Sequence, residues 1–178
     1  IYDRRIDFKV EETLKRYDNL TEKYQRPDAH YDRLYRSDYI HPEPDLQCEE
    51  CCGNDEEHLL ERKERSARFK VKVHHGLIAS SNMLLKNAGV RDKWAAKAGV
   101  LCFEMEAAGL MNDFPCVVVR GICDYADSHK NDKWQGYAAM TAAAYAKELL
   151  EEIPITTVKE QARIVDIENK GQLSFYDH

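Results

Sequence analysis

Hydrophobic and polar positions divide the chain into three zones. Residues 1–68 are rich in charge and tyrosine, residues 69–154 alternate between apolar runs and polar turns, and residues 155–178 carry sparse apolar positions without a clear period. In the first zone, apolar side chains recur at helical spacing over Val10–Tyr24 and predict an amphipathic helix. We interpret the zones as a charged helix with an inserted loop, a core, and a linker tail.

The middle zone predicts an α/β fold. Runs rich in β-branched residues favour strands, and alanine-rich segments favour helices. The predicted strands are Phe69–His75, Val100–Met105 and Cys116–Ile122, and the predicted helices are Asn82–Lys97, Ala107–Met111 and Trp134–Leu150. Strands that alternate with helices indicate a layered α/β sheet, in which ligands bind at the strand ends and in the loops that follow them.

Composition and charge exclude several classes of protein. The chain has 43% hydrophobic and 33% charged residues, and no stretch approaches the ~20 apolar residues that a membrane-spanning helix needs. A net charge of −6 argues against a general nucleic-acid binder, which normally has a basic face. The six cysteines form no even framework of spaced pairs, which favours a reducing setting. We therefore expect a cytoplasmic protein without nucleic-acid or membrane partners.

A proline- and cysteine-containing loop follows the predicted helix. Cys48, Cys51 and Cys52 cluster in a Glu-rich stretch. Cys48 and Cys51 have the C-x-x-C spacing of zinc ligands, but no second pair follows, so the sequence favours a chain without a metal site. Three histidines are interpreted as structural: His74, His75 and His129. A long polar insertion is either a functional lid or disordered, and the sequence leaves both alternatives open.

Carboxylates stand at two of the predicted strand ends. Glu104 and Glu106 flank Met105 and lie on one side of an extended chain, and Asp124 follows an apolar run. For any one of these acids, a helix cap or a surface charge is the ordinary interpretation.

The order of these segments resembles a known family. GLIASSN, followed by CFEMEAAGLMNDFPCVVVRGICDYADSHKNDKWQGYAAMTAAAYAKELL, is similar to the C-terminal half of the nucleoside phosphorylase superfamily, the purine and uridine phosphorylases and methylthioadenosine nucleosidases. The similarity is strong over residues 69–152, weaker over RPDAHYDRLYRSDYIHP, and closest to the fungal multidomain branch. It implies a three-layer α/β/α fold with a central mixed sheet whose N-terminal part is missing. It also implies fusion to ankyrin, tetratricopeptide or nucleotide-binding switch domains.

The resemblance implies roles for five residues. Asp124 matches the catalytic acid that protonates the departing purine at N7, and a general acid contributes typically ~10²–10⁴-fold. Glu106 matches the carboxylate that binds the ribose hydroxyls, and Met105 matches the side chain that packs against the ribose. Ala79 and Ser80 match the loop along the base, where small side chains let the backbone approach the substrate.

Two hypotheses follow from the resemblance. In the first, the chain belongs to an enzyme that cleaves the N-glycosidic bond of a purine nucleoside or nucleotide without a cofactor or metal. Phosphate is left open as a co-substrate, because the residues that select the nucleophile lie in the missing half. In the second, the chain is a non-catalytic ligand-sensing or scaffold module of a fungal multidomain protein. In both we expect a fragment of a larger protein, and a homo-oligomer is left open.

Overall fold

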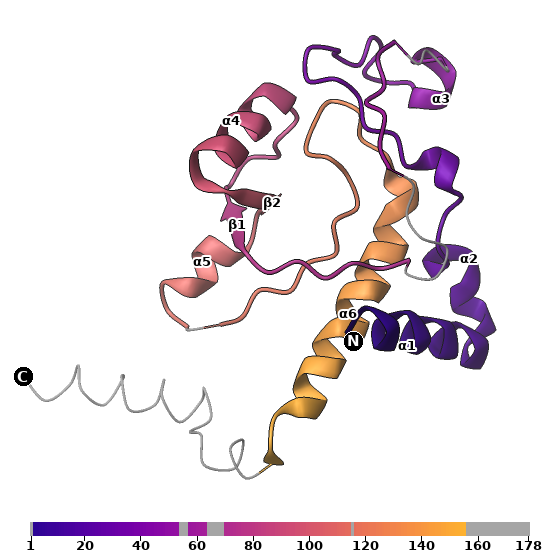
Figure 1. Ribbon diagram of the computed structural model, residues 1–178, viewed down its shortest axis with the longest axis vertical. Coiled ribbons are helices and arrows are strands. Elements are labelled where there is room, and N and C mark those ends of the chain that lie inside the picture. Colours follow the sequence, from indigo (N-terminus) through magenta and orange to yellow (C-terminus); the bar gives the residue numbers. More distant parts are fainter. Residues whose placement is uncertain (1, 54–56, 64–69, 115, 156–178) are drawn as a thin grey trace, which may run out of the picture. The chain divides into compact units, whose positions relative to one another are not determined.

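The computed structural model describes residues 2–53, 57–63, 70–114 and 116–155 (Figure 1). Its elements follow in the order α1 (Tyr2–Arg16), η1 (Asp18–Leu20), α2 (Thr21–Tyr24), η2 (Ala29–Tyr31), α3 (Cys48–Cys51), β1 (Leu77–Ser80), α4 (Ala88–Ala98), β2 (Val100–Glu104), α5 (Ala107–Met111), η3 (Asp132–Trp134) and α6 (Gln135–Glu152). The chain divides into two compact units, Ile1–Tyr145 and Ala146–His178. No helix among the described residues is long and apolar enough to cross a membrane. The predicted tail lies outside the described residues beyond Ile155.

The sheet of the described residues is one pair of parallel strands, β1 and β2 (Figure 1). Ala79 lies opposite Phe103 in the register of the two strands. Parallel neighbours need a crossover connection, and α4 lies within it. The side chain of Asn87 caps α4 by accepting the backbone N–H of Val90 at 3.0 Å, and Gly99 ends the helix in the left-handed conformation (φ 66°).

The predicted three-layer α/β/α fold is wrong. The described residues are rich in helix, and they contain a two-stranded parallel sheet in place of a central mixed sheet. The predicted strand Cys116–Ile122 is not a strand, and the side chains of Val117 and Ile122 are 78% and 52% exposed. A preference for β-structure acts through packing against neighbouring strands. These exposed side chains lack that packing, so the apolar composition of the run does not produce a strand.

The predicted strand Phe69–His75 is not a strand over its described residues, 70–75. Its backbone forms hydrogen bonds with side chains of a helix instead. The carboxylate of Asp7 accepts the backbone N–H of Lys70 at 3.1 Å, and the carboxylate of Asp3 accepts that of Val73 at 3.0 Å. Both acids belong to α1. Side-chain acceptors therefore occupy N–H groups that a neighbouring strand would otherwise bond.

The core of the first unit joins α1 to the start of α6. Ile6 and Val10 stand one helical turn apart on α1 and are buried together with Val71 and Tyr137. The sequence predicts that Trp134 and Tyr137 pack the last helix onto the sheet. In the structure both pack into this core beside α1. Helix-to-helix packing thus replaces the helix-to-sheet packing of the predicted fold.

A close approach of two backbones makes Gly121 a specific requirement. A Cβ at this position would overlap the carbonyl oxygen of Ala138 in α6, whereas a Cβ at Gly109 in α5 would meet open space. We expect Gly121→Ala to destabilise the chain by about 1–3 kcal/mol, the usual cost of overpacking. Gly109→Ala, the matched control, is expected to be neutral or to stabilise by up to about 1 kcal/mol. Urea unfolding of both variants measures the difference, and equal midpoints would contradict the close approach.

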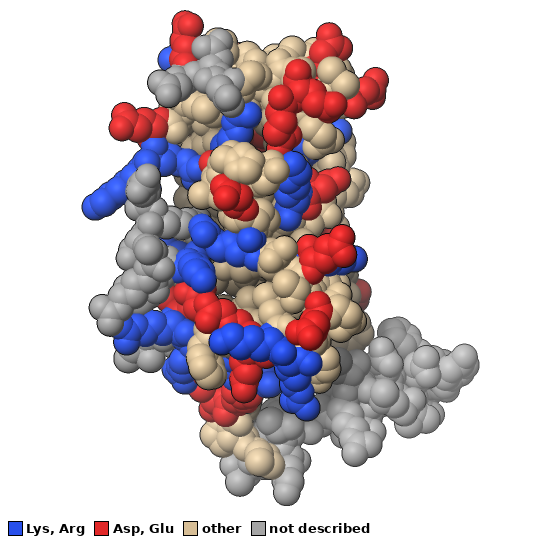
Figure 2. Space-filling model, turned by 90° about the vertical axis from the view of Figure 1, so that its right-hand side faces the viewer, with Lys and Arg blue, Asp and Glu red and all other residues tan. Residues whose placement is uncertain are grey.

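Charged side chains of both signs share the surface. Figure 2 shows Lys and Arg interspersed with Asp and Glu on one face. Exposed ion pairs such as Arg36–Asp38 (3.2 Å) and Lys70–Glu11 (3.1 Å) contribute little stability. The described residues of this face form no continuous basic stripe of the kind that is typical of nucleic-acid binders.

Candidate metal centre

Residues 29–53 and 57–62 fold around a small core of their own. An antiparallel bridge joins Tyr35 to Leu59, and backbone hydrogen bonds flank it. Tyr35, Cys48 and Cys52 are buried together, with Leu59 packed against them. The short helix α3 begins with a capping box in which Gln47 and Glu50 satisfy each other's backbone N–H groups. The described part of the insertion, which the sequence leaves open as a lid or as disorder, is therefore packed around its cysteines.

Four potential metal ligands meet at this core: His41, Cys48, Cys52 and His129. We call them the donor cluster. Their ligand atoms all lie within 4.8 Å of one another. Nδ1 of His129 lies 3.7 Å from Sγ of Cys48 and 3.6 Å from Sγ of Cys52. Cys48, Cys52 and His129 are buried, with 4–6% of each residue exposed. The cluster thus brings a loop, a helix and a distant loop to one point.

The loop that carries His129 is fixed from two sides. The buried carboxylate of Asp127 accepts the backbone N–H of His129 at 2.9 Å, and Arg91 of α4 lies 3.6 Å from the other carboxylate oxygen. On the opposite side, the hydroxyl of Ser128 accepts the backbone N–H of His41 at 3.0 Å. A hydrogen bond from His41 to the residue before His129 therefore joins the two segments that carry these histidines.

Contacts of the His129 ring set which nitrogen faces the thiols. The ring stacks on Tyr35 with centroids 3.8 Å apart, and its Nε2 lies 3.0 Å from the carbonyl oxygen of Tyr39. A carbonyl only accepts, so Nε2 carries the proton and donates. Burial lowers the pKa of His129, which keeps the imidazole neutral at pH 7. In that tautomer Nδ1 presents a lone pair to both sulfur atoms.

The buried thiols are poor acids without a nearby cation. Burial raises the pKa of Cys48. Burial, followed by repulsion from Cys48, raises the pKa of Cys52 to about 12. A bound metal ion reverses this balance, because it coordinates the thiolate and displaces the proton. Two thiolates and two imidazoles form a closed four-ligand set of the kind that holds a metal for structure and not for catalysis.

The sequence does not predict either histidine of the donor cluster as a metal ligand. Cys48 and Cys51 have the C-x-x-C spacing, but no second pair of cysteines follows. His129 is separated from Cys52 by 77 positions, so no local spacing links the two. The one available signal was a histidine a few residues before the cysteines, His41.

The ends of β1 and β2 bring together four of the residues that the sequence predicts to bind substrate. Ala79 and Ser80 lie in β1, and Met105 and Glu106 directly follow β2. The hydroxyl of Ser80 accepts the backbone N–H of Ala108 at 3.0 Å, which ties β1 to the start of α5. Met105 is 44% exposed. Their assignment to a purine nucleoside stays a prediction from the sequence.

Glu104 acts as a cap, which is the ordinary interpretation of an acid at a strand end. Its Oε2 accepts the backbone N–H groups of Glu106 and Ala107, each at 2.9 Å, at the start of α5. Burial opposes the ionised form, but hydrogen bonds from Ser80 and these N–H groups outweigh it and lower the pKa of Glu104.

Asp124 lies in a different loop from the other predicted residues. Its Oδ1 accepts the backbone N–H of Ala126 at 2.8 Å and the ammonium of Lys130 at 2.6 Å. Glu106 pairs with Arg120 at 3.0 Å. Within the described residues, no hydrogen bond or ion pair connects Asp124 to Glu106. Each carboxylate is engaged by its own neighbours.

Comparison with known proteins gives one match. Over 98 residues, the chain is 55% identical to a protein of the fungus Hyaloscypha variabilis described as a nucleotide-binding leucine-rich repeat (NLR)-like protein. The matched residues are 55% of this chain and 10% of that protein, so the chain spans a small part of its relative. No protein-family model matches the chain, and no solved structure matches it.

These comparisons correct the family prediction. The resemblance to the nucleoside phosphorylase superfamily is wrong: no family model supports it, and the matched relative carries the description of an NLR-like protein. Short segments such as EMEAAG and RGICDYAD suggested that family, but the described residues contain a two-stranded sheet and not a three-layer α/β/α fold.

Proposed function

We propose that the chain is a non-catalytic scaffold module of a multidomain, NLR-like protein. The observation that carries this proposal is the donor cluster, because it brings four potential metal ligands from distant segments together in one packed core. A closed set leaves no position at which a substrate or a reactive water binds.

The state of the predicted catalytic carboxylates supports a non-catalytic role. A general acid must reach the substrate atom to which it gives its proton. Asp124 instead accepts hydrogen bonds from Ala126 and Lys130, and so holds the turn that precedes His129. Glu106 faces Arg120, and 63% of its side chain is exposed. Both acids thus serve the local structure.

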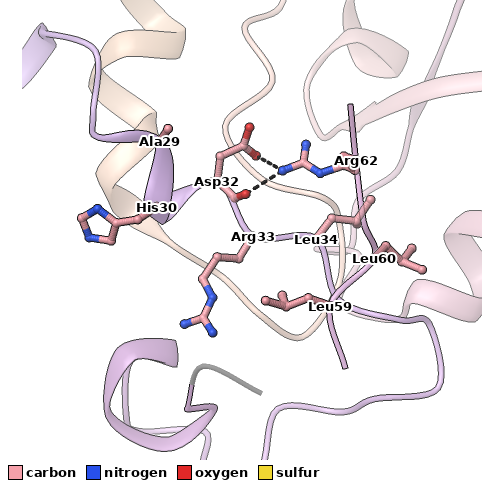
Figure 3. Close-up of a pocket in the computed structure, with 8 residues that line it drawn as sticks. All are labelled: Ala29, His30, Asp32, Arg33, Leu34, Leu59, Leu60 and Arg62. Carbon is pink, nitrogen blue, oxygen red and sulfur yellow. Dashed lines mark hydrogen bonds and ion pairs between the residues drawn. The ribbon is translucent and has the colours of Figure 1, made fainter. Parts of the chain in front are cut away.

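A pocket beside the cluster favours a scaffold over a ligand sensor. It measures about 310 Å³, and Figure 3 shows the residues that line it: Ala29, His30, Asp32, Arg33, Leu34, Leu59, Leu60 and Arg62. Its charged groups are already paired. Arg62 bridges the carboxylate and carbonyl oxygens of Asp32 at 3.0 and 2.6 Å, and Arg33 donates to the carbonyl of Gly53. A ligand would have to displace these contacts, and the volume is at the lower end for small-molecule sites.

Membership of a larger protein is supported by the relative. The 98 matched residues of the chain correspond to a tenth of that protein, whose description is that of a nucleotide-binding leucine-rich repeat (NLR)-like protein. A scaffold of this size is then one module among several. Sequencing of the full-length transcript tests this part: a reading frame that encodes a nucleotide-binding region or leucine-rich repeats beside the chain supports it, and a short frame without them contradicts it.

The absence of catalysis is tested by nucleobase release. We expect no release from adenosine, inosine, guanosine or ATP, with or without phosphate, above the level of Asp124→Asn, because Asp124 is engaged in its own loop. Chromatography of the free bases provides the measurement. Release that falls at least ~10²-fold in Asp124→Asn, the loss typical of a missing general acid, would overturn the proposal.

A further inference from the structure

The donor cluster has the ligand types and spacing of a tetrahedral zinc centre. We propose that His41, Cys48 and His129, together with one thiolate of the adjacent pair Cys51–Cys52, bind one structural Zn²⁺ ion. With Zn–S near 2.3 Å and Zn–N near 2.0–2.1 Å, tetrahedral geometry places sulfur and nitrogen ligands roughly 3.5 Å apart. The distances from His129 to the two thiols, 3.7 and 3.6 Å, are close to this value. The ligand atoms that lie farthest apart, within 4.8 Å of each other, have to approach by about 1 Å when the ion binds.

Nδ1 of His129 can accept a hydrogen bond from one of its two neighbouring thiols at a time. Nδ1 of His129 has one lone pair, yet two sulfur atoms approach it at similar distances. One S–H can donate to that lone pair, and the second thiol is then left with a nitrogen that no longer accepts. A metal ion placed among the three atoms binds the lone pair and both sulfurs at once.

The surroundings of His129 are those of a metal-binding imidazole. Ligating histidines usually donate their second ring nitrogen to a carbonyl or carboxylate, which orients the ring. Nε2 of His129 does this with the carbonyl of Tyr39 at 3.0 Å. Tyr35 stacks on the ring at 3.8 Å and restricts its rotation. The ring is therefore oriented before any ion arrives.

Charge and ligand softness select zinc. Two thiolates neutralise Zn²⁺, so the loaded centre has no net charge, as the burial of Cys48 and Cys52 requires. Magnesium and calcium prefer oxygen ligands, and the donor cluster offers none. A four-coordinate set of two sulfurs and two nitrogens is typical of zinc.

Two neighbouring thiols, those of Cys51 and Cys52, are candidates for the fourth ligand. Sγ of Cys51 lies 3.5 Å from Nε2 of His41 and 3.8 Å from Sγ of Cys52. Cys52 is buried, and its sulfur atom lies within 4.8 Å of the other ligand atoms of the cluster. Both observations favour Cys52 as the fourth ligand. Cys51 completes the C-x-x-C spacing with Cys48. A tetrahedral ion takes one of the two.

Metal analysis of the untagged chain tests the proposal. We expect about one zinc per chain by mass spectrometry, and Co²⁺ added to the zinc-free chain should give the intense d–d absorption of a tetrahedral site with thiolate ligands. Cys48→Ser and His129→Gln are expected to weaken metal binding by more than ~100-fold, beyond the effect of losing a second-shell contact. Cys116→Ser, which changes an exposed cysteine outside the cluster, is the matched control and should bind as the wild type does.

Each outcome bears on the proposal. Loss of binding in Cys51→Ser or in Cys52→Ser supports it and identifies the fourth ligand, and loss only in the double variant supports it and shows that either thiol can bind the ion. Tetrahedral cobalt absorption of the wild type needs no variant, so a misfolded mutant cannot mimic the result. A folded wild-type chain that takes up neither zinc nor cobalt would overturn the proposal, as would full binding by both Cys48→Ser and His129→Gln. The scaffold function can fail separately, through Asp124-dependent release of a nucleobase.

Discussion

Removal of the metal with a strong chelator is expected to lower the midpoint of thermal unfolding by roughly 10 °C. An ion present at about 1,000 times its dissociation constant stabilises the folded state by about 4 kcal/mol. In a domain of this size, 1 kcal/mol shifts the midpoint by about 2–4 °C. The ion acts only on the folded chain, because 77 positions separate Cys52 from His129 and the unfolded chain does not hold them together. Differential scanning fluorimetry with and without chelator measures the shift.

Zinc added after the chelator should restore the midpoint, and magnesium should not. In Cys48→Ser, which lacks a ligand, the chelator should leave the midpoint unchanged, whereas Cys116→Ser should respond as the wild type does. Hydrogen exchange should increase first at the amides of α3 and His129, and least in β2. If the wild-type midpoint is the same with and without the chelator, the ion contributes nothing to folding.

Local signals account for the elements that the sequence predicts correctly. Ala107–Met111 is a helix with the predicted bounds, and the predicted strand Val100–Met105 corresponds to β2. The alanine-rich run Trp134–Leu150 falls in η3 and α6. In each case, propensity and the flanking turn residues agree with the observed packing.

Predictions that depend on a partner element fail. Cys116–Ile122 has strand composition, but no described strand pairs with it. The predicted helix Val10–Tyr24 begins earlier, at the start of α1, and is interrupted after Arg16, where the 3-10 helix η1 follows. The spacing of its apolar residues predicts that part of this segment is helical, but it does not predict where the helix ends. Helix boundaries depend on capping and on tertiary packing.

The sequence could not predict the candidate site for a similar reason. Cys48 and Cys51 have the spacing of one half of a zinc motif. The other half consists of His41 in the insertion and of His129, which a turn capped by Asp127 presents 81 positions after Cys48. A ligand supplied by a distant turn has no periodicity, so only the folded chain identifies it.

Truncation of Ile6 is expected to destabilise the chain by about 2–5 kcal/mol, the usual cost of deleting a fully buried aliphatic side chain. Ile6 is 0% exposed and packs in the core that joins α1 to Val71 and Tyr137. Ile6→Ala therefore leaves a cavity between the N-terminal helix and segments far along the chain. Urea unfolding, followed by the helical circular dichroism signal, measures the change in the free energy of unfolding.

Phe8 provides the matched control on the same helix. It lies two positions from Ile6 and is 66% exposed, so Phe8→Ala should change the free energy of unfolding by less than about 0.5 kcal/mol. Both substitutions introduce alanine into α1, so the gain in helix propensity is similar and largely cancels in the comparison. A large difference means that α1 unfolds together with the residues around Val71 and Tyr137. If both variants unfold at the wild-type midpoint, α1 is not part of the cooperative core.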